Sequence, residues 1–270
     1  MELSITELLT YIRCPFYYRF KYKLDAPTLQ IKAIEHWKTC LYVTAINFFK
    51  EWYGSRSLPD IKYLQDSWQN IWYPQLDLDV ALDFSGSGRK TRQSLGNDGW
   101  LNLLHLHKYF SKNPLSLTGI DYPYSIQLGQ HTLTGKIDLL TYTTTDQTRL
   151  MGIKLCPSSY EASKMYGYNS LEMVAYRKFI GDFLERMYPK ANFKKGEAKA
   201  ELGFFVLENV NNQFYTTHRN DEQEIQLEAI VNSVCKAIEQ DIYFPDIGYK
   251  CHNCDYKSRC NKGKWIEKKN

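Results

Sequence analysis

The chain has 270 residues, of which 43% are hydrophobic and 24% are charged, so it is long enough for one large domain or two small ones. Aromatic residues make up 15% of the chain and the net charge is only +4, which excludes an intrinsically disordered protein. The sequence has no apolar run of about 18 residues and no signal-peptide pattern. We therefore expect a soluble cytoplasmic protein, whose small positive charge permits a polyanionic partner but does not require one.

The N-terminal part is predicted to be helical. Ser4 is a good N-cap and Glu7 stands three residues later, a spacing that indicates a capping box at the start of a short helix. This helix should end before Cys14-Pro15, because the residue before a proline disfavours helical geometry. A longer helix is expected over about 31–52, where Ala, Glu, Lys, Leu and Phe dominate.

Residues 54–115 are interpreted as an insertion of mixed helix and loop. A helix is expected over 97–111, and the polar run over 85–91 should be an exposed loop. This run resembles a phosphate-binding loop only superficially, because the spacing of the P-loop glycines and lysine is absent.

The character of the sequence then changes to strands. Residues 118–144 and 148–156 alternate and are rich in Ile, Leu, Thr and Tyr, which predicts three strands in an antiparallel meander. Breaks at 129–130 and 145–146 separate them. A helical period returns over 169–187, where apolar residues recur on one face.

A further strand pair is predicted over 201–208 and 213–218, followed by a helix over 221–241 and a cysteine-rich tail. The order of elements predicts a mixed α/β fold in one domain. Its expected parts are a helical N-terminal part (1–53), the insertion (54–115), the core of meander, helix and further strands (116–220), and a C-terminal helix with the tail (221–270).

The tail is the most informative part of the composition. Three of the seven cysteines, Cys251, Cys254 and Cys260, crowd into ten residues, and such clustering indicates a metal centre rather than disulfides in a reducing compartment. On spacing alone zinc and an iron–sulfur centre are equally suitable, since both accept four thiolates. His252 is an alternative fourth ligand for zinc.

The other candidates for a fourth thiolate are the cysteines outside the tail: Cys14, Cys40, Cys156 and Cys235. Cys14 is the best of them because it lies at a predicted helix end beside a proline, whereas the other three lie in helical or strand patterns and suit small core positions. A site that joins Cys14 to the tail would close a loop of more than two hundred residues, and such a clip contributes on the order of 5 kcal/mol in the chain-entropy model.

Two signals combine into a family resemblance. Residues 3–9 lead into 11–18 around Cys14-Pro15, and the distant tail has the spacing Cys-x2-Cys-x5-Cys. Together they resemble the RecB-like PD-(D/E)XK nucleases that carry a 4Fe–4S cluster, among them the CRISPR-adaptation exonucleases and the AddB helicase–nuclease subunits. The resemblance implies a restriction-endonuclease-like core and a 4Fe–4S cluster, with four ligands: Cys14, Cys251, Cys254 and Cys260.

The same resemblance points to nuclease residues in the meander. Gly135-x-x-Asp138 matches the family's Gly-x-x-Asp motif, which would make Asp138 a ligand of Mg²⁺ or Mn²⁺. The next strand should carry Asp/Glu-x-Lys. Lys154 is in place, but Gly152 stands where the second carboxylate belongs, and glycine cannot ligate a metal.

Two further family positions fall on helices. His36, with Ala33 three residues earlier, fits the family's histidine ligand, while a rival register would place Thr44 there. After the meander, Glu172 and Tyr176 have the spacing of the family's Gln-x-x-x-Tyr motif, and residues four apart share a helix face.

The resemblance, taken with Gly152, therefore implies an iron–sulfur, DNA-binding protein of the nuclease fold that is catalytically impaired or inactive. An active metal-dependent nuclease that uses Glu172 as a migrated carboxylate is the first alternative, and a zinc-binding regulator is the second. Basic and aromatic residues beside Cys14 and the tail cysteines would form one patch for single DNA strands or DNA ends. The basic ones are Arg13, Arg19, Lys21, Lys23, Lys250, Lys257, Arg259, Lys262 and Lys264. The resemblance also implies a partner protein in DNA repair, recombination, CRISPR adaptation or mobile-element processing.

Overall fold

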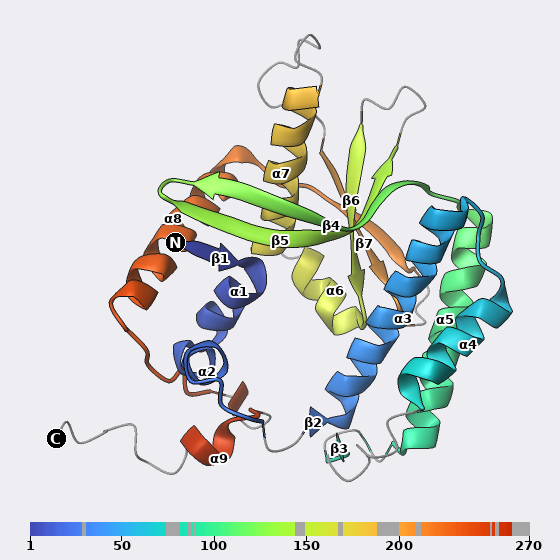
Figure 1. The fold of residues 1–270 in the computed structure, drawn as a ribbon, viewed down its shortest axis with the longest axis horizontal. Helices are drawn as coiled ribbons and strands as arrows, with labels where there is room; N and C mark the ends of the chain where they lie inside the picture. The colour runs from blue at the N-terminus through green and yellow to red at the C-terminus, as the bar shows by residue number, and fades with distance from the viewer. Residues whose placement is uncertain are drawn as a thin grey trace.

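The computed structural model describes residues 1–28, 31–73, 82–85, 88, 90–143, 149–166, 170–187, 200–208, 212–248, 250–251 and 254–260. Its centre is a mixed sheet in the order β1-β5-β6-β7-β8, with β4 paired to β5 (Figure 1). The strands are β1 (Glu2–Ser4), β4 (Ser116–Leu128), β5 (His131–Tyr142), β6 (Leu150–Cys156), β7 (Glu201–Val206) and β8 (Phe214–Thr217).

The predicted meander is present as β4, β5 and β6, which pair antiparallel in sequence order. Gly129 turns the chain between the first two strands with a φ of +59°, a conformation in which glycine has no Cβ penalty. The second expected break, at 145–146, lies outside the described residues. The strand β7 adds parallel to β6, and β1 adds parallel to β5.

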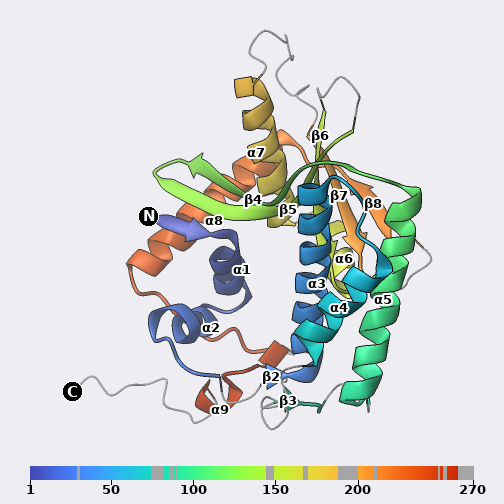
Figure 2. The same ribbon diagram turned by 45° about the vertical axis from the view of Figure 1, so that its right-hand side comes forward.

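Two layers of helices cover the sheet. On one face lie α1 (Ile5–Arg13), α7 (Leu171–Met187) and α8 (Asp221–Glu239); on the other lie α3 (Ala33–Ser55), α4 (Ile61–Trp72) and α5 (Arg92–Lys112). The shorter elements are α2 (Pro15–Tyr18), η1 (Arg19–Lys23), β2 (Ile31–Lys32), β3 (Leu82–Asp83), α6 (Ser159–Tyr166) and α9 (Lys257–Cys260). Figure 2 shows α3, α4 and α5 together beside the sheet. None of the helices in the described ranges has the length and apolar character needed to cross a bilayer.

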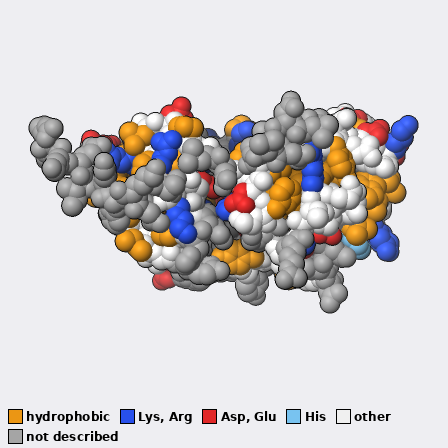
Figure 3. Space-filling view, turned by 90° about the horizontal axis from the view of Figure 1, so that it is seen from below, with side chains coloured by type: hydrophobic (Ala, Val, Ile, Leu, Met, Phe, Trp, Pro, Cys, Tyr) orange, Lys and Arg blue, Asp and Glu red, His pale blue; other side chains and the backbone are white. Residues whose placement is uncertain are grey.

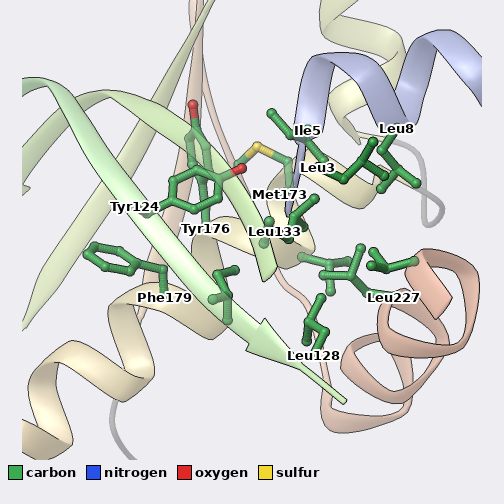
Figure 4. Close-up of a cluster of buried hydrophobic side chains, with 14 of the residues drawn as sticks. Leu3, Ile5, Leu8, Tyr124, Leu128, Leu133, Met173, Tyr176, Phe179 and Leu227 are labelled. Atoms are coloured by element: carbon green, nitrogen blue, oxygen red, sulfur yellow. The ribbon is translucent and has the colours of Figure 1, made fainter. Parts of the chain in front are cut away.

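The two apolar cores follow from these layers. In Figure 4, side chains of β1, α1, α7 and α8 meet those of the meander. The strand β6 is buried on both faces, which agrees with its nearly continuous apolar sequence, and Lys154 is its only residue that is not fully buried. A lysine in the middle of a buried strand needs a charged partner to be stable there.

The helix α4 was not predicted; its residues belong to the stretch expected to be mixed helix and loop. Asp60 caps it by accepting a hydrogen bond from the Tyr63 amide at 2.7 Å, and the buried residues Leu64, Trp68 and Trp72 are spaced four apart along one face. The two indole rings stack with centroids 5.7 Å apart. The cap and the stripe were both readable in the sequence, and the apolar face packs against α3 and α5.

The two ends of the chain meet, as the proposed Cys14 clip requires. The Tyr11 hydroxyl donates to the Ile242 carbonyl at 2.6 Å, and the Phe16 amide donates to the Phe244 carbonyl at 3.2 Å. The predicted capping box at the start of α1 is present, with Glu7 and the N-cap Ser4 bonded reciprocally. The N-terminal helices and the C-terminal tail therefore form one corner of the fold (Figure 1).

Candidate functional site

Asp138 lies where two central strands separate. The strands β5 and β6 pair from Leu139 opposite Ile153 to Tyr142 opposite Leu150, and Asp138 follows just beyond this ladder. Its Oδ2 accepts a hydrogen bond from the backbone amide of Leu155 at 2.8 Å. The Asp138 carboxylate thus accepts the hydrogen bond that a carbonyl of a neighbouring strand would otherwise accept from the Leu155 amide. The residue is only 1% exposed.

Side chains from a helix and a strand complete the surroundings of this carboxylate. The Tyr42 hydroxyl, from α3, donates to Oδ1 of Asp138 at 2.9 Å. The Lys154 Nζ, from β6, lies 3.4 Å from each carboxylate oxygen. With the Leu155 amide, both oxygens of Asp138 are held by donors of the protein itself.

The helix α7 brings in a second carboxylate. Glu172 lies in its first turn and places Oε1 2.8 Å from the Lys154 Nζ. One turn later the Tyr176 hydroxyl donates to the Lys136 carbonyl at 3.0 Å and accepts from the Asp138 amide at 3.3 Å. The four-residue spacing therefore places Glu172 and Tyr176 at one site, where the structure also brings Asp138 and Lys154.

The electrostatics of the site are those of a buried ion pair. Burial raises the pKa of Asp138, although the Lys154 ammonium opposes this shift. Burial alone lowers the pKa of Lys154, but Asp138 and Glu172 outweigh it and raise that pKa well above its usual value. Burial also raises the pKa of Tyr42, so its phenol stays protonated and acts as a donor to the carboxylate.

Gly152 stands opposite Leu140 in the β5–β6 ladder. A Cβ built on Gly152 would lie 2.9 Å from Cδ1 of Ile180, 3.2 Å from Cδ2 of Tyr176 and 3.5 Å from Cγ2 of Ile137. Apolar parts of α7 and β5 thus fill the space into which a side chain at this position would point. The space of the missing motif carboxylate is part of the core.

His36 has its contacts away from these carboxylates. Its Nε2 lies 3.4 Å from Sγ of Cys40 and its ring stacks on Trp72, with centroids 5.8 Å apart. Burial and the Arg92 charge lower its pKa. Among the contacts of the described residues, the structure does not bring His36 to Asp138.

The residue of α3 that does face Asp138 is Tyr42, which the sequence reasoning missed. The family position calls for a histidine, so the motif gave no reason to choose Tyr42. Thr44, the alternative residue for the family's histidine position, has its hydrogen bond elsewhere: it is buried and donates to the Cys40 carbonyl at 2.8 Å. The docking of α3 on the sheet, rather than the motif, decides which turn meets the carboxylate.

The four predicted cluster cysteines gather in the corner where the chain ends meet. Cys14 links α1 to α2 in extended geometry, and Cys260 ends α9. Burial raises the pKa of Cys254 and Cys260, and nearby Cys14 and Cys251 add to both shifts. All four are half-buried, whereas Cys40, Cys156 and Cys235 are buried core residues as predicted.

Tyrosines hold the tail in this corner. The Tyr17 hydroxyl donates to Asp255 at 2.7 Å, and the Tyr256 hydroxyl donates to the Ala26 carbonyl at 3.2 Å. The Tyr256 ring also lies 4.9 Å from that of Tyr17 and 5.3 Å from that of Phe20. Within the described ranges, no group of three or more His, Cys, Asp or Glu side chains is close enough to hold a single metal ion.

Basic and aromatic side chains interleave around the same corner. The Arg13 guanidinium lies 5.4 Å from the centre of the Tyr17 ring, and Arg19 lies 5.9 Å from that of Tyr243. Lys250 is paired with Asp246 and donates to the Arg13 carbonyl. Seen from below, blue side chains are interspersed with orange and red ones (Figure 3). The expected contributions of Lys262 and Lys264 lie outside the described residues.

The fold and the site combine a mixed sheet that has a central meander, a buried aspartate on β5 where the β5–β6 ladder ends, and a lysine on the next strand. A family model of the PD-(D/E)XK nuclease superfamily matches residues 74–261, and the chain belongs to this superfamily. No curated protein matches the chain. A solved structure titled "Crystal structure of SSO0001" is similar with 11% sequence identity and a TM-score of 0.32, covering 92% of this chain and 94% of the other.

Proposed function

We propose that this protein binds DNA on its nuclease scaffold and cleaves it poorly or not at all. The observation that carries the proposal is the state of Asp138, whose two carboxylate oxygens are already held by Tyr42, Lys154 and the Leu155 amide. Magnesium demands near-octahedral oxygen ligation and sheds its waters reluctantly. A carboxylate that is neutralised by a lysine and by hydrogen bonds is a poor ligand for it.

Two further features support the same proposal. The strand position of the second carboxylate is Gly152, and its side-chain space is filled by Ile180 and Tyr176. The α3 residue beside Asp138 is a tyrosine with a raised pKa, so it offers a protonated phenol rather than an imidazole lone pair. The residues present therefore do not fit a tightly bound Mg²⁺.

A metal-dependent nuclease is the second candidate, and Glu172 is the observation that favours it. This carboxylate lies 2.8 Å from the Lys154 Nζ, so α7 supplies the negative charge that Gly152 removes from β6. For a metal to bind, Lys154 would have to leave both carboxylates. Asp138 and Glu172 would then hold Mg²⁺ or Mn²⁺, which polarises a phosphate and activates water when bound.

The iron–sulfur cluster and the RecB-like subtype belong to the proposal as well. Each cysteine of a 4Fe–4S cluster has its own iron, so its thiolates stand further apart than those around a single ion. The gathering of Cys14, Cys251, Cys254 and Cys260 in one corner supports such a cluster. Iron and sulfide analysis of anaerobically purified protein distinguishes it from the zinc of a regulator.

The proposed ligand is single-stranded DNA or DNA ends, bound by the basic and aromatic corner. Guanidinium groups beside tyrosine rings suit a surface that combines phosphate contacts with base stacking. A partner protein in DNA repair, recombination, CRISPR adaptation or mobile-element processing would then cleave the bound DNA itself or act on DNA that has been cleaved. The association of such a partner is part of the same proposal.

A binding and cleavage assay with labelled single-stranded and duplex DNA tests the proposal. We expect salt-sensitive binding and no cleavage with Mg²⁺, and at most a trace with Mn²⁺, which such sites bind more tightly. Robust cleavage with Mg²⁺ that Glu172→Gln abolishes would instead establish the second candidate. Glu185→Gln is the matched control, because Glu185 is an exposed residue of the same helix.

A further inference from the structure

Tyr124 is a buried polar residue without a hydrogen-bond partner. It lies on β4, is 3% exposed, and its hydroxyl has no partner among the described residues. Buried hydroxyls are nearly always bonded, because an unmet one loses its hydration without compensation. Such a group in a folded protein calls for an explanation, and its position supplies one.

The Tyr124 ring packs directly on Gly135, the glycine of the Gly-x-x-Asp motif. Tyr124 stands directly opposite Gly135 in the β4–β5 ladder. A Cβ on Gly135 would lie 2.4 Å from both Cζ and Oη of Tyr124, so any larger residue would displace the phenol. Gly135, the glycine of Gly-x-x-Asp138, therefore allows the Tyr124 ring of β4 to lie across the neighbouring strand β5.

The ring of Tyr124 packs against α7, the helix that carries Glu172. Tyr124 meets the Tyr176 ring edge-on at 6.1 Å, and Figure 4 shows the two rings side by side between the strand and α7. The charges of Glu172, Lys154 and Asp138 all act on the Tyr124 hydroxyl, with Glu172 the strongest of the three. The unused donor therefore lies beside the turn of α7 that follows Glu172.

The partners of Glu172 show why a spare donor matters there. Its carboxylate is bonded to Lys154 at 2.8 Å, and its side chain is only 13% exposed. If Lys154 turns to a phosphate of DNA, Glu172 is left as a charge with little access to water. A buried charge that loses its partner is costly, so the release of Lys154 requires a replacement donor.

We propose that Tyr124 is a positioning residue that takes over the carboxylate of Glu172 when Lys154 leaves it, which frees Lys154 to bind a DNA phosphate. The inference rests on the proposed DNA-binding function for its purpose, but the exchange itself is a property of the free protein. The side chain of Glu172 moves from one donor to another, and no bond other than hydrogen bonds forms or breaks.

A double-mutant cycle in the absence of DNA tests the exchange. With Lys154 present, Tyr124→Phe removes an unmet hydroxyl, so the melting temperature should stay the same or rise. With Lys154→Met, Tyr124 should already hold Glu172, so the same Tyr124→Phe change should lower the melting temperature by about 2–4 °C. Lys154→Gln, which keeps a donor beside Asp138, replaces the methionine variant if that one does not fold.

Tyr122→Phe is the matched control, because it makes the same change two residues away on the same strand, where the ring packs on Phe179 and Phe183. Tyr122→Phe should change the melting temperature in the same direction whether Lys154 is present or replaced by methionine. If Tyr124→Phe destabilises the protein that retains Lys154, the hydroxyl already has a partner and the proposal is overturned. An equal effect of Tyr124→Phe in both backgrounds overturns it as well.

Binding of a single-stranded oligonucleotide without divalent metal gives the second readout. Tyr124→Phe should weaken the affinity by roughly three- to tenfold, the loss of about one hydrogen bond, while Tyr122→Phe leaves it unchanged. Unaltered affinity of Tyr124→Phe would refute the proposed use of the exchange. If the unmodified protein binds no DNA but Tyr124→Phe lowers the melting temperature only when Lys154 is replaced, the proposed function fails and the exchange stands.

Discussion

The carboxylate–lysine site and the four-cysteine corner are built in opposite ways. The site joins neighbouring strands and one turn each of α3 and α7, and its charges are satisfied within the protein: Lys154 pairs with Asp138 and Glu172. The corner joins residues at the two ends of the chain through tyrosine hydrogen bonds and ring contacts. Its four cysteines form no disulfide. The charges of the site are thus paired within the protein, whereas the corner is where we propose that a ligand binds.

The largest effect is expected in the corner. Cys14→Ala should remove the cluster and open the loop it closes, at a cost on the order of 5 kcal/mol of unfolding free energy. Iron content, sulfide content and thermal unfolding measure it. Cys235→Ala, at a buried core cysteine, should keep the iron; full iron and sulfide in Cys14→Ala would show that the ligand set is wrong.

The second effect concerns the ion pair of the site. Lys154→Met leaves two carboxylates without their cation, so we expect a loss of about 3–5 kcal/mol at neutral pH, measured by denaturant unfolding. Because burial raises the pKa of Asp138, its protonated form is favoured in the folded state. The deficit of the variant should therefore shrink as the pH falls, and a deficit that grows on acidification would contradict the assignment.

The unaltered protein should show the opposite dependence at high pH. The pKa of Lys154 is raised by Asp138 and Glu172, so the stability from this pair is complete below the ordinary lysine value of 10.5. It is lost as the pH rises through the higher folded value. Alkaline unfolding of the wild type and of Lys154→Met should accordingly converge.

A smaller effect tests the space at Gly152. Gly152→Asp restores the motif carboxylate, but its Cβ would lie 2.9 Å from Cδ1 of Ile180. We expect the single variant to lose about 1–3 kcal/mol through overpacking without gaining Mn²⁺ affinity. The double variant Gly152→Asp with Ile180→Ala makes room and should bind Mn²⁺ better than Ile180→Ala alone, as measured by calorimetry. A gain of affinity in the single variant would show that the core yields at this position.

The smallest effect concerns the basic corner. Lys21 is exposed, so Lys21→Ala should weaken DNA binding equally for all sequences and reduce the salt slope by about one unit or less. Lys112→Ala, at the exposed end of α5 on the other side of the sheet, is the control. Equal salt slopes for both variants would exclude the corner as the phosphate-binding surface.

Local patterns were sufficient for most elements of the fold. The capping box of Ser4 and Glu7, the alternation of the meander and the apolar face of α7 each depend on residues within a few positions of one another. The sequence also paired Glu172 with Tyr176, because their spacing fixes one helix face. The helix α4 was missed although the spacing of Leu64, Trp68 and Trp72 is a local pattern of the same kind.

The sequence by itself thus determined most of the longer strands and helices, the positions of Asp138 and Lys154 on neighbouring strands, and the absence of a carboxylate at position 152. Only the tertiary structure decided that Tyr42, rather than His36, meets Asp138, that Ile180 fills the space beside Gly152, and that Tyr124 lies across Gly135. The physical reason is that secondary structure follows from contacts within a few residues, whereas these three facts depend on how helices dock on the sheet. Docking is set by the close packing of whole faces, and no local spacing encodes it.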